Sequence, residues 1–194
     1  MNELNQKTDL RVVKTMNALT GAMSELLCEK DLDSITVKEI CDRAQTRKAT
    51  FYNHFSDKND LLAYIIRTQM ELSEMEGAVR DDPDDPMIYY MDILLYLMNF
   101  LEKNEKMAQQ IVKSESYAAV SSLYKDEMEP VLYERFKAEQ KKGNGHIYLP
   151  RMLASVISDM IMLTAQYWFL HKDSVTEKDA AGQLVMLIEP LFEK

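Results

Sequence analysis

The sequence predicts an all-α protein. Its 194 residues include 46% hydrophobic residues but only five glycines and five prolines, which suits long helices joined by short links. No stretch alternates cleanly between polar residues and Val, Ile or Thr, as a half-buried strand would. The length fits one large domain or two small ones, and the apolar fraction is ample for a packed core.

The first expected element is a helix from Asp9 to Glu29, preceded by a polar arm over residues 1–8. Apolar residues recur in this helix at steps of three and four, which places them on one stripe that faces the core. A short link over residues 30–35 follows. The stripe consists of Val12, Met16, Leu19, Met23, Leu26 and Leu27.

A capping box opens the next helix. Thr36 stands where an N-cap should, and Glu39 follows three residues later, just before an apolar run. A turn comes at Gln45 and Thr46, and a second short helix is expected over residues 47–53. Helix, short turn, helix is a DNA-reading device, although two capped amphipathic helices also occur in other helical domains. The apolar face of the first of these two helices contains Val37, Ile40, Cys41 and Ala44.

The second short helix carries side chains that suit contact with DNA. It would present Arg47, Lys48 and Thr50 outward, with Phe51 and Phe55 pointing inward. Arg and Lys can bond guanine, Thr can bond a base or touch a thymine methyl group, and Asn can pair with adenine. Side chains that flank the helix could reach phosphate oxygens, and these are Tyr52, His54 and Lys58.

This stretch resembles the DNA-binding segment of the TetR family of bacterial transcription regulators. The resemblance rests on Thr36-Val37, Ile40-Cys41, Ala44, Thr50-Phe51-Tyr52, His54-Phe55, Lys58 and Leu61, and it covers about the first 68 residues. The Thr-Phe-Tyr-x-His-Phe-x-x-Lys core is highly specific. The resemblance implies that the DNA-binding residues are Thr36, Val37, Lys38, Arg47, Lys48, Ala49, Thr50, Tyr52, Asn53, His54 and Lys58.

Three residues in the turn depart from the family pattern. The usual Gly, Val and Ser are Gln45, Thr46 and Arg47 here. Glycine accepts a positive φ without cost, whereas glutamine in the left-handed region is strained. The turn is therefore either shaped differently from that of the family, or it carries about 1 kcal/mol or more of strain.

The resemblance also implies two domains and about nine helices. Residues 1–68 would form a three-helix DNA-binding domain, and residues 69–194 a helical domain for ligand binding and dimerisation. A long helix from Asp57 to about Val79 would belong to both, so that a change at its far end would tilt the DNA-binding motif. The DDPDDP run at residues 81–86 ends it, because two prolines and four acids cannot continue a helix.

The last two helices are the most apolar part of the chain. Two such helices from each of two subunits can form a four-helix bundle, so we expect a homodimer through Pro150–His171 and Thr176–Phe192; the alternative is that both pack within one subunit.

Residues 153–170 are apolar enough to suggest a membrane span, but Asp159 near the bilayer centre would cost roughly 2.5–3.5 kcal/mol. A buried or interface helix is therefore favoured, and no membrane partner is expected. One face of the last helix contains Leu184, Leu187, Ile188 and Leu191.

Helices are expected between these parts as well, over residues 87–102, 104–114 and 116–142, with a kink or restart at Pro130. They are rich in Met and Tyr, which suit a pocket for apolar or aromatic ligands, although each such residue can equally be plain core. Asp159 needs a partner in its apolar run, either a cationic ligand or a hydrogen bond. The candidate ligand-binding residues are Tyr64, Tyr96, Phe100, Met107, Tyr124, Met128, Met160 and Tyr167.

Charge is distributed unevenly along the chain. Residues 1–60 hold 9 Lys and Arg against 10 Asp and Glu, whereas residues 61–194 hold 14 against 22. Within residues 43–58 there are four basic residues and one acid. Because screening acts over roughly 10 Å, this local field matters more than the net charge of −9. The distribution is compatible with DNA binding.

The sequence gives no support for an enzymatic function. His54, His146 and His171 have no Cys or acid at metal-ligand spacing, and no phosphate-binding loop or nucleophile motif occurs. No metal or cofactor is expected. Cys28 and Cys41 are expected to be free thiols. The polar start at residues 1–9 predicts no signal peptide, hence a cytoplasmic protein.

The predicted function is a homodimeric transcription regulator that binds a palindromic double-stranded DNA operator. It would be a repressor released by a small apolar or aromatic ligand, whose binding favours a dimer that no longer matches the half-sites. The alternative is a regulator or coactivator of the same fold that a partner protein controls. A helical enzyme is a third hypothesis, which the lack of a catalytic constellation disfavours.

Overall fold

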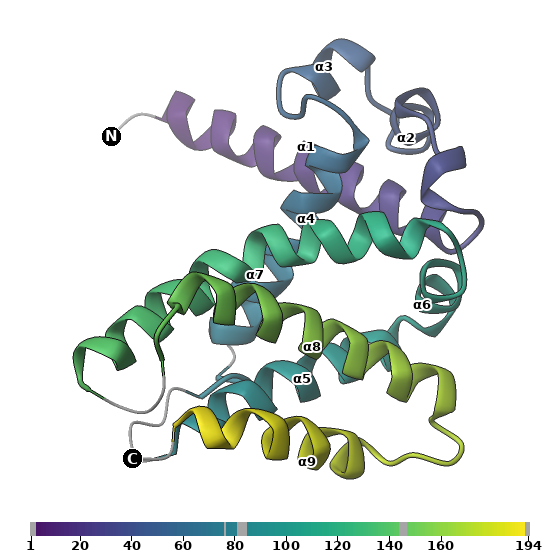
Figure 1. The fold of residues 1–194 in the computed structure, drawn as a ribbon. Helices are drawn as coiled ribbons and strands as arrows, with labels where there is room; N and C mark the ends of the chain where they lie inside the picture. Colours follow the sequence, from purple (N-terminus) through teal and green to yellow (C-terminus); the bar gives the residue numbers. More distant parts are fainter. Residues whose placement is uncertain (1–2, 76, 81–84, 144–146, 193–194) are drawn as a thin grey trace. The chain divides into compact units, whose positions relative to one another are not determined.

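The computed structural model describes residues 3–75, 77–80, 85–143 and 147–192. These residues contain nine α-helices, two short 3-10 helices and no strand, which confirms the predicted all-α class. Figure 1 shows the helices in chain order. Their bounds are α1 (Glu3–Leu27), η1 (Leu32–Ser34), α2 (Val37–Arg43), α3 (Lys48–Tyr52), α4 (Lys58–Met75), α5 (Pro86–Lys103), α6 (Glu105–Val112), α7 (Ser116–Lys141), α8 (Pro150–His171), α9 (Glu177–Ile188) and η2 (Glu189–Leu191).

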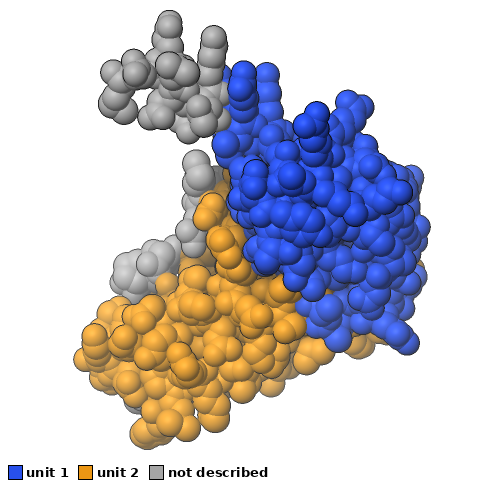
Figure 2. Space-filling model, turned by 90° about the horizontal axis from the view of Figure 1, so that it is seen from above, with its two compact units in different colours: residues 1–66, 106–119 blue, residues 67–105, 120–194 orange. Residues whose placement is uncertain are grey.

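The chain divides into two compact units, coloured blue and orange in Figure 2. The first contains residues 1–66 and 106–119, and the second contains residues 67–105 and 120–194. One boundary lies within α4, after Ile66; the predicted division into residues 1–68 and 69–194 stays a prediction. The inclusion of α6 and the start of α7 in the first unit was not predicted, because their sequences carry no sign of which core they join.

The first unit has a core to which α1, α2 and α3 contribute. Leu19, Met23 and Leu27 of α1 are fully buried, as are Ile40 of α2 and Phe51 of α3. Val12 was predicted to belong to the same stripe but is 40% exposed. The N-terminal half of α1 extends past α2 and α3 (Figure 1), and Val12 on this half is therefore partly in solvent.

The second unit packs α5, α8 and α9 against one another. Each helix contributes fully buried residues, for example Tyr90, Ile161 and Leu184. By length and composition α8 could cross a membrane, but its buried side lies in this core. Asp85 caps α5 by accepting the Met87 N–H at 2.9 Å, which places a helix start at the end of the predicted break; residues 81–84 lie outside the described residues.

Pro130 was expected to cause a kink or a restart; it lies inside α7, which continues through it without a restart. One prediction about a helix in this unit was wrong in detail. The supposed single face of the last helix divides, since Leu184 and Ile188 are buried while Leu187 is 58% exposed. At 100° per residue, Leu187 lies about 60° from Leu184 around the helix, and this angle carries it out of the core and into solvent.

Candidate DNA-binding site

A capping box holds the start of α2, as predicted. The Thr36 hydroxyl accepts the Glu39 N–H at 3.3 Å, and the Glu39 carboxylate accepts the Thr36 N–H at 2.9 Å. The Lys30 ammonium donates to the same carboxylate at 2.6 Å. The hydrogen bonds from Lys30 and Thr36 lower the pKa of Glu39 from 4.5 to about 2. A lysine of the preceding link is thus part of the cap, which local spacing did not reveal.

The turn between α2 and α3 contains a residue in the left-handed region. Gln45 has a φ of +52°. Among the described residues, every other residue with a positive φ is a glycine. The Thr46 N–H donates to the Cys41 carbonyl at 2.9 Å, and the Gln45 N–H donates to the Asp42 carbonyl at 3.3 Å. These two bonds form a Schellman motif, which needs positive φ at this position. Of the two possibilities left open, the strained turn is therefore the one observed.

The helix α3 is fixed to the core by a single aromatic residue. Phe51 is fully buried, and its ring lies 5.7 Å from that of Phe55. A five-residue helix with one buried anchor leaves most of its other side chains in solvent. The exposed predicted residues in and beside α3 are Arg47, Lys48, Ala49, Tyr52, Asn53 and His54, and the half-buried one is Thr50. Before this segment, Thr36 and Lys38 are exposed and Val37 is half-buried.

The four basic residues of this segment divide into two pairs. Arg43 donates two hydrogen bonds to the Glu29 carboxylate, at 2.6 and 2.8 Å, and thereby ties α2 to the turn that follows α1. Lys58 is bonded to backbone carbonyls. By contrast, no acid lies within ion-pair distance of Arg47 or Lys48 among the described residues. The uncompensated positive charge therefore lies at the start of α3, where base edges would be contacted.

Lys58 holds the link before α2 rather than pointing into solvent. Its ammonium donates to the carbonyl oxygens of Leu32, Asp33 and Ile35 at 2.7, 3.1 and 3.0 Å. An ammonium has three donors, so all of them are used within the protein. This geometry argues against the predicted phosphate contact by Lys58, because that contact would require the ammonium to leave these carbonyls.

The predicted ligand-binding residues do not gather in one unit. Tyr64 and Met107 belong to the first unit, and the ring of Tyr64 packs 5.6 Å from that of Phe55. The other six belong to the second unit, where Tyr124 and Met128 are buried. Tyr167 is 57% exposed and stacks on His171 at 4.2 Å, so it does not line an enclosed pocket of that unit. The remaining members are Tyr96, Phe100 and Met160, which are half-buried.

Asp159 has the partner that its apolar surroundings required. The Lys125 ammonium of α7 donates to its carboxylate at 2.7 Å, and the Asp159 side chain is half exposed. An ion pair between two helices of the second unit therefore explains this acid, and no cationic ligand is needed. Among the described residues, no group of three His, Cys, Asp or Glu side chains could hold a metal ion.

Comparison with known proteins points to one family. The family model for bacterial regulatory proteins of the tetR family matches residues 19–65. The chain is 39% identical over 66 residues to the uncharacterized HTH-type transcriptional regulator YxbF of Bacillus subtilis, an alignment that covers 34% of this chain and 17% of that protein. It is 28% identical over 110 residues to DhaS of Lactococcus lactis, a transcriptional activator of the dhaKLM operon, over 56% of this chain and 52% of DhaS. The chain thus aligns with about half or less of each of these relatives.

Solved structures resemble the chain over nearly its whole length. A TetR-family regulator from Syntrophomonas wolfei has a TM-score of 0.64 at 16% identity, over 91% of this chain and 94% of that one. NalD of Pseudomonas aeruginosa, the secondary repressor of the MexAB-OprM efflux pump, has a TM-score of 0.59 at 18% identity, over 92% of this chain and 96% of NalD. At these identities the likeness concerns the fold.

Proposed function

Because the chain belongs to the TetR family of bacterial regulatory proteins, we propose that it is a cytoplasmic homodimeric repressor that binds a palindromic operator. The observation that carries the proposal is the start of α3, where Arg47 and Lys48 are exposed and have no acidic partner among the described residues. Their charge is available to guanine or phosphate, while Arg43, at the end of α2, is paired with Glu29.

Dimerisation is required because one short helix contacts too few bases to be specific. Two copies must hold their α3 helices about 34–36 Å apart to occupy neighbouring half-sites. We assign this task to the outer faces of α8 and α9, as the sequence suggested. Large apolar side chains are exposed there, whereas monomeric proteins rarely expose many together. They are Met152, Val156, Leu163, Tyr167 and Leu170 on α8, and Met186 and Leu187 on α9.

The proposed effector is a small apolar or aromatic molecule that binds in the second unit. Tyr124 and Met128 are buried there, and aromatic and polarisable side chains of this kind suit such ligands. Burial raises the pKa of the Tyr124 hydroxyl, so the hydroxyl stays neutral at alkaline pH as well. A ligand that prefers one arrangement of the dimer would change operator affinity through linkage.

DNA binding is tested with the DNA that flanks the coding region, since regulators of this kind often bind next to their own gene. Fluorescence anisotropy would measure affinity for this fragment and for a scrambled fragment of equal length. Lys48→Ala should weaken specific binding by roughly 1–3 kcal/mol and relax one base position. Lys141→Ala, which removes an exposed lysine from α7 in the second unit, serves as the matched control. Equal affinities for wild type and Lys48→Ala would place α3 outside the groove.

Activation under the control of a partner protein is the second candidate. It is favoured by the similarity to DhaS, which is named as a transcriptional activator. In vitro transcription from the flanking promoter separates the two. A repressor lowers transcript yield when it is added alone, and an apolar effector restores the yield. An activator raises the yield, and control by a partner would make the yield depend on that protein.

A further inference from the structure

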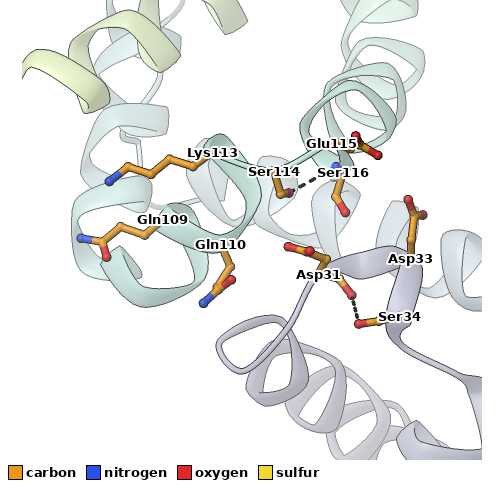
Figure 3. Close-up of a pocket in the computed structure, with 9 residues that line it drawn as sticks. All are labelled: Asp31, Asp33, Ser34, Gln109, Gln110, Lys113, Ser114, Glu115 and Ser116. Carbon is orange, nitrogen blue, oxygen red and sulfur yellow. Dashed lines mark hydrogen bonds between the residues drawn. The ribbon is translucent and has the colours of Figure 1, made fainter.

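A polar pocket of about 680 Å³ lies within the first unit, between η1 and the segment that joins α6 to α7. Figure 3 shows its lining, in which every residue is polar or charged. Three of them are carboxylic acids, Asp31 just before η1, Asp33 within η1 and Glu115 before α7, and the single basic residue is Lys113. The lining thus carries a net negative charge, and it offers no apolar wall to a hydrophobic ligand.

The charged groups of this pocket are not engaged with the protein. The side chains of Asp31, Asp33, Glu115 and Lys113 make no ion pair or hydrogen bond within the described part of the chain. Nearby acids behave differently, since Glu39 is bonded to Lys30 at 2.6 Å. The pocket carboxylates therefore keep their full capacity to accept hydrogen bonds.

A buried hydroxyl provides an independent sign of a ligand. Ser116 is only 2% exposed, and its hydroxyl has no hydrogen-bond partner in the structure. In Figure 3 this hydroxyl points into the space between the start of α7 and η1. Leaving a buried hydroxyl unbonded costs free energy, so a polar group that enters the pocket would satisfy it. The neighbouring Ser114 hydroxyl already accepts the Ser116 N–H at 3.2 Å.

We propose that this pocket binds a small organic cation with several N–H donors, that is, a diamine or a polyamine. Acceptors outnumber donors in the lining, and its net charge repels anions. A single metal ion fits less well, because no three acidic, His or Cys side chains of the described residues converge on one point. A flexible amine can instead place separate ammonium groups against separate carboxylates, with one N–H donated to Ser116.

The site has a direct connection to the DNA-binding motif. Asp33, which lines the pocket, also gives its carbonyl oxygen to the Lys58 ammonium at 3.1 Å. Lys58 is the first residue of α4, which follows α3 in the chain. A bound amine would thus stabilise the link that holds α4 in place. Binding itself is measured without DNA, so the inference stands independently of the proposed repressor function.

Equilibrium dialysis of labelled spermidine against the full chain, at physiological salt, tests the proposal. We expect saturable binding to a single site per chain. Asp31→Asn with Asp33→Asn should weaken it at least about tenfold, because bonds to charged groups are the strong ones. Ser116→Ala should weaken it roughly 3–10-fold. Lys113→Gln should strengthen it by about 2–5-fold, because a like charge is removed. Circular dichroism would verify that each variant is folded.

The matched control is Asp126→Asn with Asp173→Asn, which removes two exposed carboxylates from the second unit. Unchanged spermidine binding in this variant supports the pocket. An equal loss in both double variants would show general attraction to an acidic protein and overturn the proposal. So would absence of saturable binding, or displacement of spermidine by sorbitol at similar concentration, which would indicate a neutral polyol site.

Discussion

Replacing Gln45 with glycine is expected to stabilise the protein, which is the reverse of the usual effect of a new glycine. Gln45 is exposed and has a φ of +52°, so its side chain contributes little packing while its Cβ opposes the backbone conformation. The left-handed region costs an L-residue roughly 1–2 kcal/mol. Glycine removes this cost and leaves the two hydrogen bonds of the Schellman motif intact.

The gain is smaller than the relieved strain, because glycine also makes the unfolded chain more flexible. That entropic loss is about 0.4–1 kcal/mol. The difference leaves a net stabilisation of up to about 1.6 kcal/mol. Each 1 kcal/mol of it corresponds to a rise in melting temperature of roughly 2–4 °C for a chain of this size. Operator affinity should stay the same, since neither Arg47 nor Lys48 is moved.

Thermal unfolding followed by circular dichroism would measure the effect. Gln45→Ala is the control at the same site, because it keeps the Cβ and should give no gain. Ala138→Gly is the control elsewhere: this exposed residue lies within α7, and the change should destabilise by about 1 kcal/mol. A lower melting temperature for Gln45→Gly than for wild type would refute the strained turn.

Four further variants test contacts that hold this motif and the proposed dimer face of α9. Lys58→Met keeps the aliphatic stem but removes three hydrogen bonds to carbonyls, so it should cost roughly 1–2 kcal/mol in urea unfolding; a lower salt slope of DNA binding would instead reveal a phosphate contact. Glu39→Gln should lower the melting temperature at pH 7. Because folding lowers the pKa of Glu39 from 4.5 to about 2, the carboxylate stabilises the fold above pH 4.5, and the difference between wild type and Glu39→Gln should narrow as pH falls from 4.5 towards 2. Leu187→Glu should yield a folded monomer with weak, salt-sensitive DNA binding, whereas Leu184→Glu should unfold the second unit because Leu184 is fully buried. Light scattering combined with circular dichroism distinguishes these two outcomes. If the Leu187→Glu protein were still a dimer, the dimer interface would lie elsewhere.

The helix-turn-helix could be predicted from sequence because its signals are local. The capping box joins Thr36 and Glu39 across one helical turn, and Gln45 stands out where the family has glycine. The three-residue and four-residue spacing of apolar side chains also indicated the core stripe of α1. Each of these features depends on neighbours within a few residues, whose geometry the helix itself determines.

Other features depend on contacts between distant residues, and no local pattern encodes them. The Arg43–Glu29 pair spans 14 residues, and the bond from Lys58 to the Leu32 carbonyl spans 26. Both cations look available to DNA in the sequence, yet both are used to hold the motif together. The grouping of residues 106–119 with the first unit has the same origin, since α6 and the start of α7 read only as amphipathic helix.

Because Arg43 and Lys58 are bonded within the protein, the positive charge that residues 43–58 offer to DNA lies at the start of α3. Counting charges along residues 43–58 spreads four bases over three helices and a turn. Once Arg43 is paired with Glu29 and Lys58 with carbonyl oxygens, the bases without such partners are Arg47 and Lys48, which are adjacent at the N-terminal end of one helix. Positive charge at that end meets the phosphates and base edges first when the helix enters a groove. The acidic remainder of the chain can then repel DNA without weakening this contact, because screening confines each effect to roughly 10 Å.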